Sequence, residues 1–385
     1  LNLSNNKLTA LPRSIVELDV FCRLNLYGNP LQTPPLEVAR RGILAMRRFF
    51  VQLDAGAAVV TQLKMVLCGD GEAGKTSLRN ALMGLPNPRA LPDARTILLD
   101  LESVGVPVEG DDKVKELTVK FFDLGGQENY VYAQAPFLTR HALFVLVVDA
   151  NKACAKYADE AVLRFITLIQ TRVPDATVQL VLSKIDDLKA EGGDVKTRCE
   201  WLWRVVKDRL EDWRKAVQKR EGKPKKEIPM IHLETDVLAV SVGKKLSDSE
   251  GIEAVRDAVV RLARSKEKFP NVGQKVPLAW FEVWQFVRAV AVHGDKSKAV
   301  EAMREGTATK PLGVDDKELS AEGAYCPLDE LRAAWSMYCE HVGKKDYSDR
   351  TFFDALKLLE AQGGVFVDAG LAFLNPQLII NVLKP

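Results

Sequence analysis

The chain has 385 residues, of which 47% are hydrophobic and 28% are charged, and its formal net charge is +2. This length predicts two or three domains, and this composition excludes an intrinsically disordered chain. The balanced charge gives no argument for a nucleic-acid partner or for an anionic membrane surface. The six cysteines include no C-x-x-C pair, which favours a reducing compartment over a disulfide framework or a zinc site.

The longest wholly apolar run, residues 142–148, is far too short to span a bilayer. We therefore expect no transmembrane segment and a cytoplasmic protein, with peripheral membrane association left open. No signal peptide is visible, and the sequence opens with Leu1 instead of methionine, which suggests an excerpt from a longer protein.

The first stretch repeats itself at a spacing typical of leucine-rich repeats. Residues 1–8 (LNLSNNKL) return as residues 24–31 (LNLYGNPL), with Asn6 and Asn29 in the same slot. Each repeat offers one short strand with inward leucines, and its asparagine hydrogen-bonds the neighbouring backbone. We expect these repeats to bind protein partners.

The apolar spacing over residues 36–53 predicts a helix that ends this repeat array. The helix either caps the array or also passes strain to the next domain. Residues 1–56 are therefore expected to be the last leucine-rich repeats of a solenoid and their capping helix.

The strongest motif is G-x-x-x-x-G-K-[ST] at residues 69–76, between an apolar run at 63–68 and a helical pattern at 77–83. Such a turn wraps its backbone around a phosphate, and the new helix points free N–H groups at the anion. Lys75 is expected to reach the outer phosphates and assist catalysis, and the Thr76 hydroxyl to hold a magnesium ion. The nucleotide-binding residues predicted here are Gly69, Gly71, Gly74, Lys75, Thr76 and Ser77.

A second motif, D-x-x-G-Q, follows an alternating strand at 117–122. Asp123 would approach the magnesium ion, Gly126 would let a backbone N–H meet the γ-phosphate, and Gln127 would orient the attacking water. Between the two motifs, Thr96 either closes over the magnesium ion as a third metal-site residue or merely starts a strand.

A third motif decides which base is bound. Residues 183–186 (SKID) match the N-K-x-D motif of guanine-binding proteins except at Ser183. The Asp186 carboxylate would accept two N–H groups of guanine, which adenine lacks, and the Lys184 stem would stack over the purine. Ser183 lacks the amide that braces neighbouring loops, which predicts weaker affinity with the base choice retained.

Residues 61–268 alternate apolar strands with helices, which predicts an α/β domain with a mostly parallel sheet and nucleotide at the carboxyl ends of its strands. Ser241 and Val242 follow the last strand and resemble the S-A-K loop that covers the guanine edge. An insert at 187–229 contains an amphipathic helix with a basic end at 214–226, either a solvated surface or a docking patch for acidic partners.

Residues 269–274 are expected to link this domain to a third one over 277–385. There, two helical patterns precede a predicted hairpin at 363–374, which is the order of a winged-helix unit. The second of these helices offers little base-reading chemistry, so we expect protein contact and no specific nucleic-acid partner. The polar stretch 293–323 holds few large apolar residues.

Repeats, a Ras-like domain and a helical module that begins with P-x-x-W at Pro277 follow one another in an order that resembles the Roco family. Its members pair a Ras-of-complex-proteins (Roc) GTPase domain with a C-terminal-of-Roc (COR) domain. The resemblance implies a Ras-like P-loop GTPase that binds GTP or GDP with Mg²⁺, hydrolyses GTP slowly and forms a homodimer through Roc and COR. Some relatives continue into a protein kinase, but this chain has no V-A-I-K, H-R-D or D-F-G series.

Two other functions compete with a GTP-driven switch. One is a constitutive scaffold that binds nucleotide for stability only. The other is an ATP-binding P-loop oligomer, which rests on residues 69–76 alone.

Overall fold

The computed structural model describes residues 1–90, 99–108, 115–126, 137–152, 162–222, 224–307, 325–344, 347, 349–361 and 364–374. The chain divides into two compact units. One contains Lys64–Glu102 and Lys120–Arg261, and the other contains Leu1–Leu63, Ser103–Val119 and Leu262–Val382. No described helix has the length and hydropathy needed to cross a bilayer.

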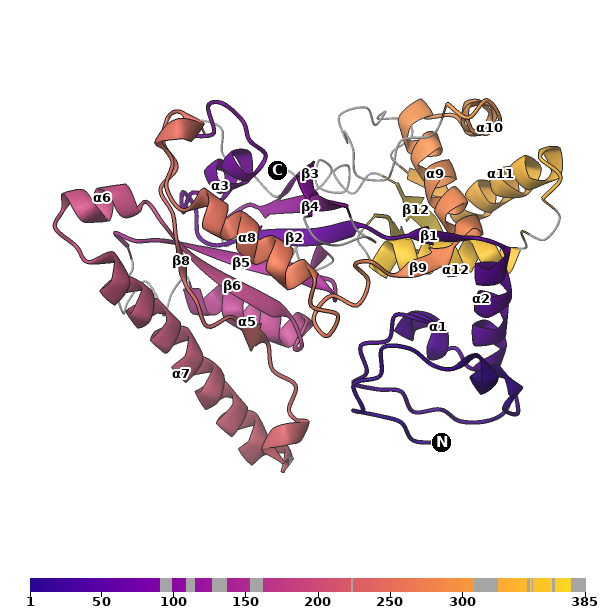
Figure 1. Cartoon of the computed structure of the whole chain (residues 1–385), viewed down its shortest axis with the longest axis horizontal. Helices are drawn as coiled ribbons and strands as arrows, with labels where there is room; N and C mark the ends of the chain where they lie inside the picture. The colour runs from indigo at the N-terminus through magenta and orange to yellow at the C-terminus, as the bar shows by residue number, and fades with distance from the viewer. Residues whose placement is uncertain are drawn as a thin grey trace. The chain divides into compact units, whose positions relative to one another are not determined.

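The predicted α/β fold is confirmed: a mostly parallel sheet is flanked by helices (Figure 1). Its elements are β2 (Gln62–Cys68), α3 (Lys75–Leu82), β3 (Leu99–Pro107), β4 (Glu116–Leu124), β5 (Ala142–Asp149), α5 (Leu163–Arg172), β6 (Thr177–Ser183), α6 (Ile185–Ala190), α7 (Val195–Glu221), the 3-10 turn η5 (Lys225–Glu227), β7 (His232–Leu233), β8 (Leu238–Ala239), the 3-10 turn η6 (Leu246–Asp248) and α8 (Ile252–Ala263).

The strand order is β3-β4-β2-β5-β6-β7, and β8 also pairs with β6. The pairs of β2 with β5, β5 with β6, and β6 with β7 and β8 are parallel. Every residue of β5 and β6 is buried, as expected for central strands covered on both faces. Because β2 lies between β4 and β5, the strand order reverses at β2, and the crevice at its carboxyl end is where this class of sheet binds ligands.

The elements of the other unit share one hydrophobic core. They are the 3-10 turn η1 (Arg13–Glu17), α1 (Leu36–Ala39), α2 (Ile43–Ala55), β1 (Ala57–Val59), β9 (Lys275–Pro277), α9 (Leu278–His293), α10 (Lys296–Arg304), β10 (Tyr325–Pro327), α11 (Leu328–His341), α12 (Asp349–Ala361), β11 (Phe366–Asp368) and β12 (Leu371–Phe373).

The N-terminal and C-terminal segments of this unit are joined by direct packing. Strand β1 pairs antiparallel with β9, and α2 packs on α9. The rings of Phe49 and Trp280 meet edge to face with centroids 5.6 Å apart, and the Trp280 indole N–H donates to Gln52 Oε1 at 2.9 Å. Figure 1 shows α2 running up to β1 beside β9. The N-terminal segment and the described C-terminal segment of this unit therefore contribute to the same core.

The repeated sequence stacks on itself with an offset of 23 residues. Parallel bridges join Asn2 to Asn25 and Ala10 to Thr33. The buried Asn29 carboxamide donates to the carbonyl oxygen of Leu3 at 2.8 Å, and its Oδ1 accepts the N–H of residues 6 and 8 at 3.0 Å each. These hydrogen bonds are the asparagine ladder that the repeat pattern predicted.

Three local expectations need correction. The helix expected over 36–53 is broken at Gly42, whose φ of +91° is a left-handed conformation, so α1 and α2 are separate. The stretch 269–274 does not behave as a free linker, because Phe269 is fully buried and Gly273 donates its N–H to the carbonyl of Val60. Helix α10, inside the polar stretch 293–323, was not expected.

The predicted C-terminal hairpin is present as β11 and β12, and β10 completes a three-stranded sheet of order β10-β12-β11. Helices α11 and α12 lie between β10 and this hairpin in the sequence. Strand, two helices and hairpin keep the winged-helix order that the sequence indicated.

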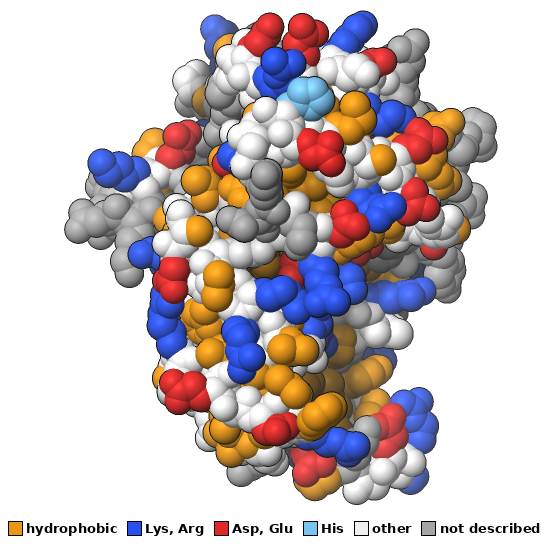
Figure 2. Space-filling model, turned by 90° about the vertical axis from the view of Figure 1, so that its right-hand side faces the viewer, with side chains coloured by type: hydrophobic (Ala, Val, Ile, Leu, Met, Phe, Trp, Pro, Cys, Tyr) orange, Lys and Arg blue, Asp and Glu red, His pale blue; other side chains and the backbone are white. Residues whose placement is uncertain are grey.

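Figure 2 shows one face of the molecule, on which acidic, basic and apolar side chains are interspersed and lysines and arginines gather near the middle. This mixture agrees with the small net charge of the chain. Outside that group, the described acidic and basic side chains of this face lie close to one another.

Candidate functional site

The phosphate loop lies between the end of β2 at Cys68 and the start of α3 at Lys75. Gly69 and Gly74 have φ values of +139° and +90°. A Cβ at Gly69 would lie 2.2 Å from the carbonyl oxygen of Val147, so only glycine fits there. The loop therefore brings its backbone against β5 and turns sharply into the helix.

The Lys75 side chain is folded under this loop. Its Nζ donates to the carbonyl oxygens of Gly69 and Asp70 at 3.0 and 2.8 Å. Burial lowers the pKa of Lys75, whereas the nearby Asp123, Cys68 and Asp70 raise it. The amine is thus held by the backbone of the phosphate loop.

Cys68 closes the strand just before this loop. Burial raises the pKa of its thiol to about 12, against the opposing effect of the Lys75 charge. The thiol is therefore protonated at neutral pH, and Cys68 packs as a small core residue.

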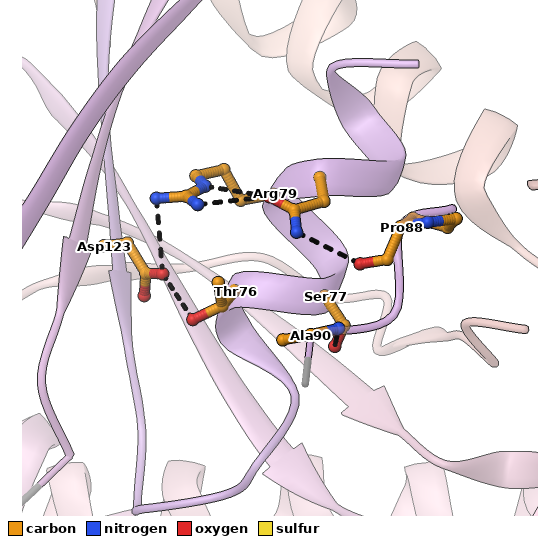
Figure 3. A network of polar contacts seen from close by, with 7 residues as sticks. Thr76, Ser77, Arg79, Pro88, Ala90 and Asp123 are labelled. Carbon is orange, nitrogen blue, oxygen red and sulfur yellow. Dashed lines mark hydrogen bonds and ion pairs between the residues drawn. The ribbon is translucent and has the colours of Figure 1, made fainter. Parts of the chain in front are cut away.

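Thr76, in the first turn of α3, meets Asp123, near the end of β4. The Thr76 hydroxyl donates to Asp123 Oδ2 at 2.7 Å, and Asp123 is fully buried (Figure 3). Hydroxyl and carboxylate oxygens are the ligands that Mg²⁺ prefers, so this pair fits a magnesium site. The other two residues expected near it, Thr96 and Gln127, lie outside the described residues.

Gly126 brings the second motif against the phosphate loop. A Cβ at this position would lie 2.3 Å from the backbone nitrogen of Gly71 and 2.4 Å from the carbonyl carbon of Asp70. A larger residue would push the two loops apart, so the glycine is required by their close approach.

The third motif follows β6 at the same edge of the sheet. Lys184 has a φ of +56°, and its Nζ donates to Asp149 Oδ2 at 2.8 Å. Asp149 is buried at the end of β5, whereas Asp186 is exposed in the first turn of α6. The side chain of Lys184 is therefore held by a hydrogen bond, whereas that of Asp186 is exposed and accessible to a ligand.

Ser183 takes over part of the brace that an asparagine would supply. Its Oγ lies 2.6 Å from the carbonyl oxygen of Ala73 in the phosphate loop and 3.1 Å from that of Val148. A hydroxyl has one proton and can satisfy only one of these acceptors at a time. The Ser183 hydroxyl, at the end of β6, therefore divides its one proton between the phosphate loop and β5.

Ser241 and Val242 are brought beside residues 184–186 because β8 pairs with β6. Ile185 donates its N–H to the carbonyl of Val240, and Ser241 exchanges two backbone hydrogen bonds with Glu250. A Cβ at residue 243 would lie 2.7 Å from Asp248 Cβ, which explains a glycine where the S-A-K loop has lysine.

The structure adds polar residues that the motifs did not reveal. Asp149 holds Lys184, and Arg79 lies 3.7 Å from Asp123. Asp149 could have been noticed as the one charged residue at the end of the apolar run 142–148. Arg79 sits within a helical pattern and carries no comparable sequence signal.

Residues 64–186 match the family model of the Ras of Complex (Roc) domain of DAPkinase. These residues form a Roc domain. The matched stretch begins at the sheet strand before the phosphate loop and ends at Asp186, so it includes all three motifs. Roc domains are a Ras-like GTPase family, which agrees with the strand order and with the arrangement of Lys75, Thr76 and Asp123.

Curated relatives extend the similarity beyond the Roc domain. The malignant fibrous histiocytoma-amplified sequence 1 homolog of Xenopus tropicalis is 25% identical over 282 residues, which is 66% of this chain and 28% of the relative. A Roc-COR-CHAT protease of Runella zeae is 29% identical over 152 residues, or 36% of this chain and 16% of the relative. The chain thus spans less than a third of these proteins.

A solved structure of Methanosarcina barkeri Roco2 RocCORdC bound to GDP matches with a TM-score of 0.51 and 20% identity. The match covers 85% of this chain and 76% of that one. At this identity the likeness shows a shared fold.

Proposed function

We propose that this protein is a guanine-nucleotide-binding switch that binds GTP and GDP with Mg²⁺ and slowly hydrolyses GTP. The observation that carries the proposal is the convergence of three separate motifs at one edge of the Roc sheet. Lys75 and Thr76 follow β2, Asp123 lies near the end of β4, and the Lys184–Asp186 loop follows β6, and these three strands belong to one sheet.

The phosphate end of the nucleotide would lie on the loop 69–76. Its backbone N–H groups and the start of α3 favour an anion, and Lys75 supplies a positive charge that is already positioned by two carbonyl groups. Thr76 and Asp123 would hold Mg²⁺, which neutralises charge on the phosphates when it is bound. Gly71, Gly74, Ser77 and Gly126 complete this part of the site.

The base end would lie between residues 184–186 and 241–242. A carboxylate accepts hydrogen bonds and donates none, so Asp186 would suit the paired N–H groups of guanine and disfavour adenine. The Lys184 stem would cover the purine, and the hydrogen bond from its Nζ to Asp149 supports this role by limiting the motion of the side chain. Ser241 and Val242 would close the far edge of the base.

The domain assignment belongs to the same proposal: the end of a repeat array over 1–56, the Roc GTPase domain over 61–268 and part of a COR domain over 277–385. In this scheme the COR segment mediates homodimerisation and responds to the nucleotide state, and the repeats bind protein partners in the cytoplasm. The core shared by described residues of 1–63 and 262–374 supports a mechanical connection between the repeat end and the COR segment.

Competitive titration of fluorescent GDP with GTP and ATP tests the nucleotide assignment. We expect GDP and GTP to bind and ATP to compete poorly, and the Asp186→Ala variant to lose the preference for guanine. Asp187→Ala, a neighbouring exposed carboxylate on the same helix turn, is the matched control. ATP binding as tight as GDP binding, unaffected by Asp186→Ala, would overturn guanine selection.

Single-turnover hydrolysis separates the switch from a constitutive scaffold. We expect slow conversion of bound GTP to GDP, and a further loss of rate in Gln127→Leu if this glutamine orients water as its motif predicts. A negligible rate that the substitution leaves unchanged would favour nucleotide bound for stability only.

A further inference from the structure

Arg79 places a second cation beside the carboxylate expected to serve the magnesium site. It follows Thr76 by three residues on α3, so both side chains lie on the same face of the helix. Arg79 Nη1 lies 3.7 Å from Asp123 Oδ2, the oxygen that also accepts the Thr76 hydroxyl at 2.7 Å. Figure 3 shows the three side chains converging from α3 and β4.

Asn80 orients the Arg79 guanidinium. Arg79 Nε and Nη2 both point at Asn80 Oδ1, at 3.3 and 3.1 Å. The Asn80 amide in turn donates to the carbonyl oxygen of Pro88 at 3.1 Å. With two of its nitrogens directed at Asn80, the planar guanidinium presents Nη1 to Asp123.

The positive charge of Arg79 matters for Asp123 because both side chains are buried. Asp123 is fully buried and Arg79 is only 6% exposed. A buried carboxylate needs a nearby positive charge, and removing that charge is costly. A magnesium ion and an arginine can each supply it, but they repel one another when both approach the same oxygen.

We propose that Arg79 is an internal cation that shares Asp123 with Mg²⁺. It keeps the carboxylate compensated and in place when the metal leaves, so that retention of nucleotide depends less on Mg²⁺ than it would with a neutral residue at position 79. The inference rests on the proposed function, and it makes Arg79 a positioning residue that acts through Asp123.

The test measures release of fluorescent GDP from the full chain, once with saturating Mg²⁺ and once with excess EDTA. The quantity compared is the release rate in EDTA divided by the release rate in saturating Mg²⁺. Arg79→Gln is neutral and can still hydrogen-bond Asn80, Arg79→Lys keeps the charge without the planar fork, and Arg204→Gln on the exposed face of α7 is a matched control.

We expect the ratio to rise roughly tenfold in Arg79→Gln, with an intermediate rise in Arg79→Lys and none in Arg204→Gln. Release with saturating Mg²⁺ should stay within about twofold of the unsubstituted chain, since the metal then compensates Asp123. This second readout separates the proposal from a general loss of packing, which would accelerate release in both conditions.

An unchanged ratio in a folded Arg79→Gln variant overturns the proposal. If that variant does not fold, Asn80→Ala, which frees the guanidinium from its orientation, must raise the ratio, and an unchanged ratio there overturns it equally. Failure of the unsubstituted chain to bind GDP in Mg²⁺ refutes the nucleotide assignment itself, and the role of Arg79 with it.

Discussion

The Lys184 ammonium donates to the buried Asp149 carboxylate at 2.8 Å, so the last residue of one central strand fixes a residue that follows the next strand. Strands β5 and β6 are parallel and in register up to the pair of Asp149 with Ser183. The ion pair therefore follows directly from the sheet, and it fixes Lys184 of the motif at residues 183–186.

Asp149→Asn tests whether this ion pair supports nucleotide binding. The asparagine keeps the size of the side chain and the acceptor that Asn151 uses, but it removes the charge that holds Lys184. We expect affinity for GDP, measured by calorimetry, to fall roughly fivefold, about 1 kcal/mol. Asp187→Asn in the first turn of α6 is the control and should bind as before. Equal affinities for both variants would contradict a role for Asp149.

Lys75→Ala removes the charge beneath the phosphate loop. The loop backbone remains, but the phosphates lose a cation that is already desolvated and held by two carbonyl oxygens. We expect affinity for GDP to fall by at least about a hundredfold, roughly 2.7 kcal/mol, in isothermal titration. Lys196→Ala, at an exposed position in the first turn of α7, controls for loss of charge alone. Retained affinity in Lys75→Ala would refute the assignment of the loop.

The sheet and its motifs could be predicted because each leaves a local signal. Fully apolar runs become β5 and β6, and the glycines of the phosphate loop are required by backbone geometry at Gly69 and Gly74. Side chains that act through a neighbour leave no such signal. Arg79 and Asp149 acquire their roles only when α3 meets β4 and when β5 meets β6.

Elsewhere, packing between distant segments overrode local patterns. Residues 269–274 look like a linker because they are rich in proline, glycine and polar side chains. In the fold, the Gln274 side-chain amide donates to the carbonyl oxygen of Gln32, and Phe269 is fully buried. Helix α10 likewise packs through small residues such as Ala299, and its best local signal was Asp295, which caps the helix by accepting the N–H of Lys298.

Because Lys64 is buried, we expect the free energy of unfolding of the Roc domain to depend on pH. Burial, helped by the nearby Lys120 charge, lowers the pKa of Lys64 to about 7 from its ordinary value of 10.5. Its Nζ donates to the carbonyl oxygen of Phe137 at 2.7 Å and lies over the Phe122 ring. Between pH 7 and 10.5 the unfolded chain binds more protons than the folded chain, so the free energy of unfolding should rise with pH.

The Lys64→Met variant provides the comparison. It removes the titrating group, so its urea midpoint should rise less between pH 7 and 9 than that of the unsubstituted protein, as followed by circular dichroism. At pH 7 and below, folding must bury the charged form of Lys64. The urea midpoint of Lys64→Met should therefore exceed that of the unsubstituted protein by the largest margin in this range. Parallel pH profiles would show that another group controls stability in this range.

Phe49 tests whether the N-terminal segment stabilises the COR-like segment. Its ring is buried on α2 and meets Trp280 of α9 edge to face, although the two residues are far apart in the sequence. Phe49→Ala would leave a cavity in the shared core, at a cost of about 3–5 kcal/mol. We therefore expect faster hydrogen exchange in α9 and α12 as well as in α2, with GDP affinity retained. Leu44→Ala, on the same helix but 51% exposed, should change exchange little. Loss of protection confined to residues 1–60 would mean that the two segments are stable independently, and would remove the mechanical connection on which the proposed coupling of repeats and COR depends.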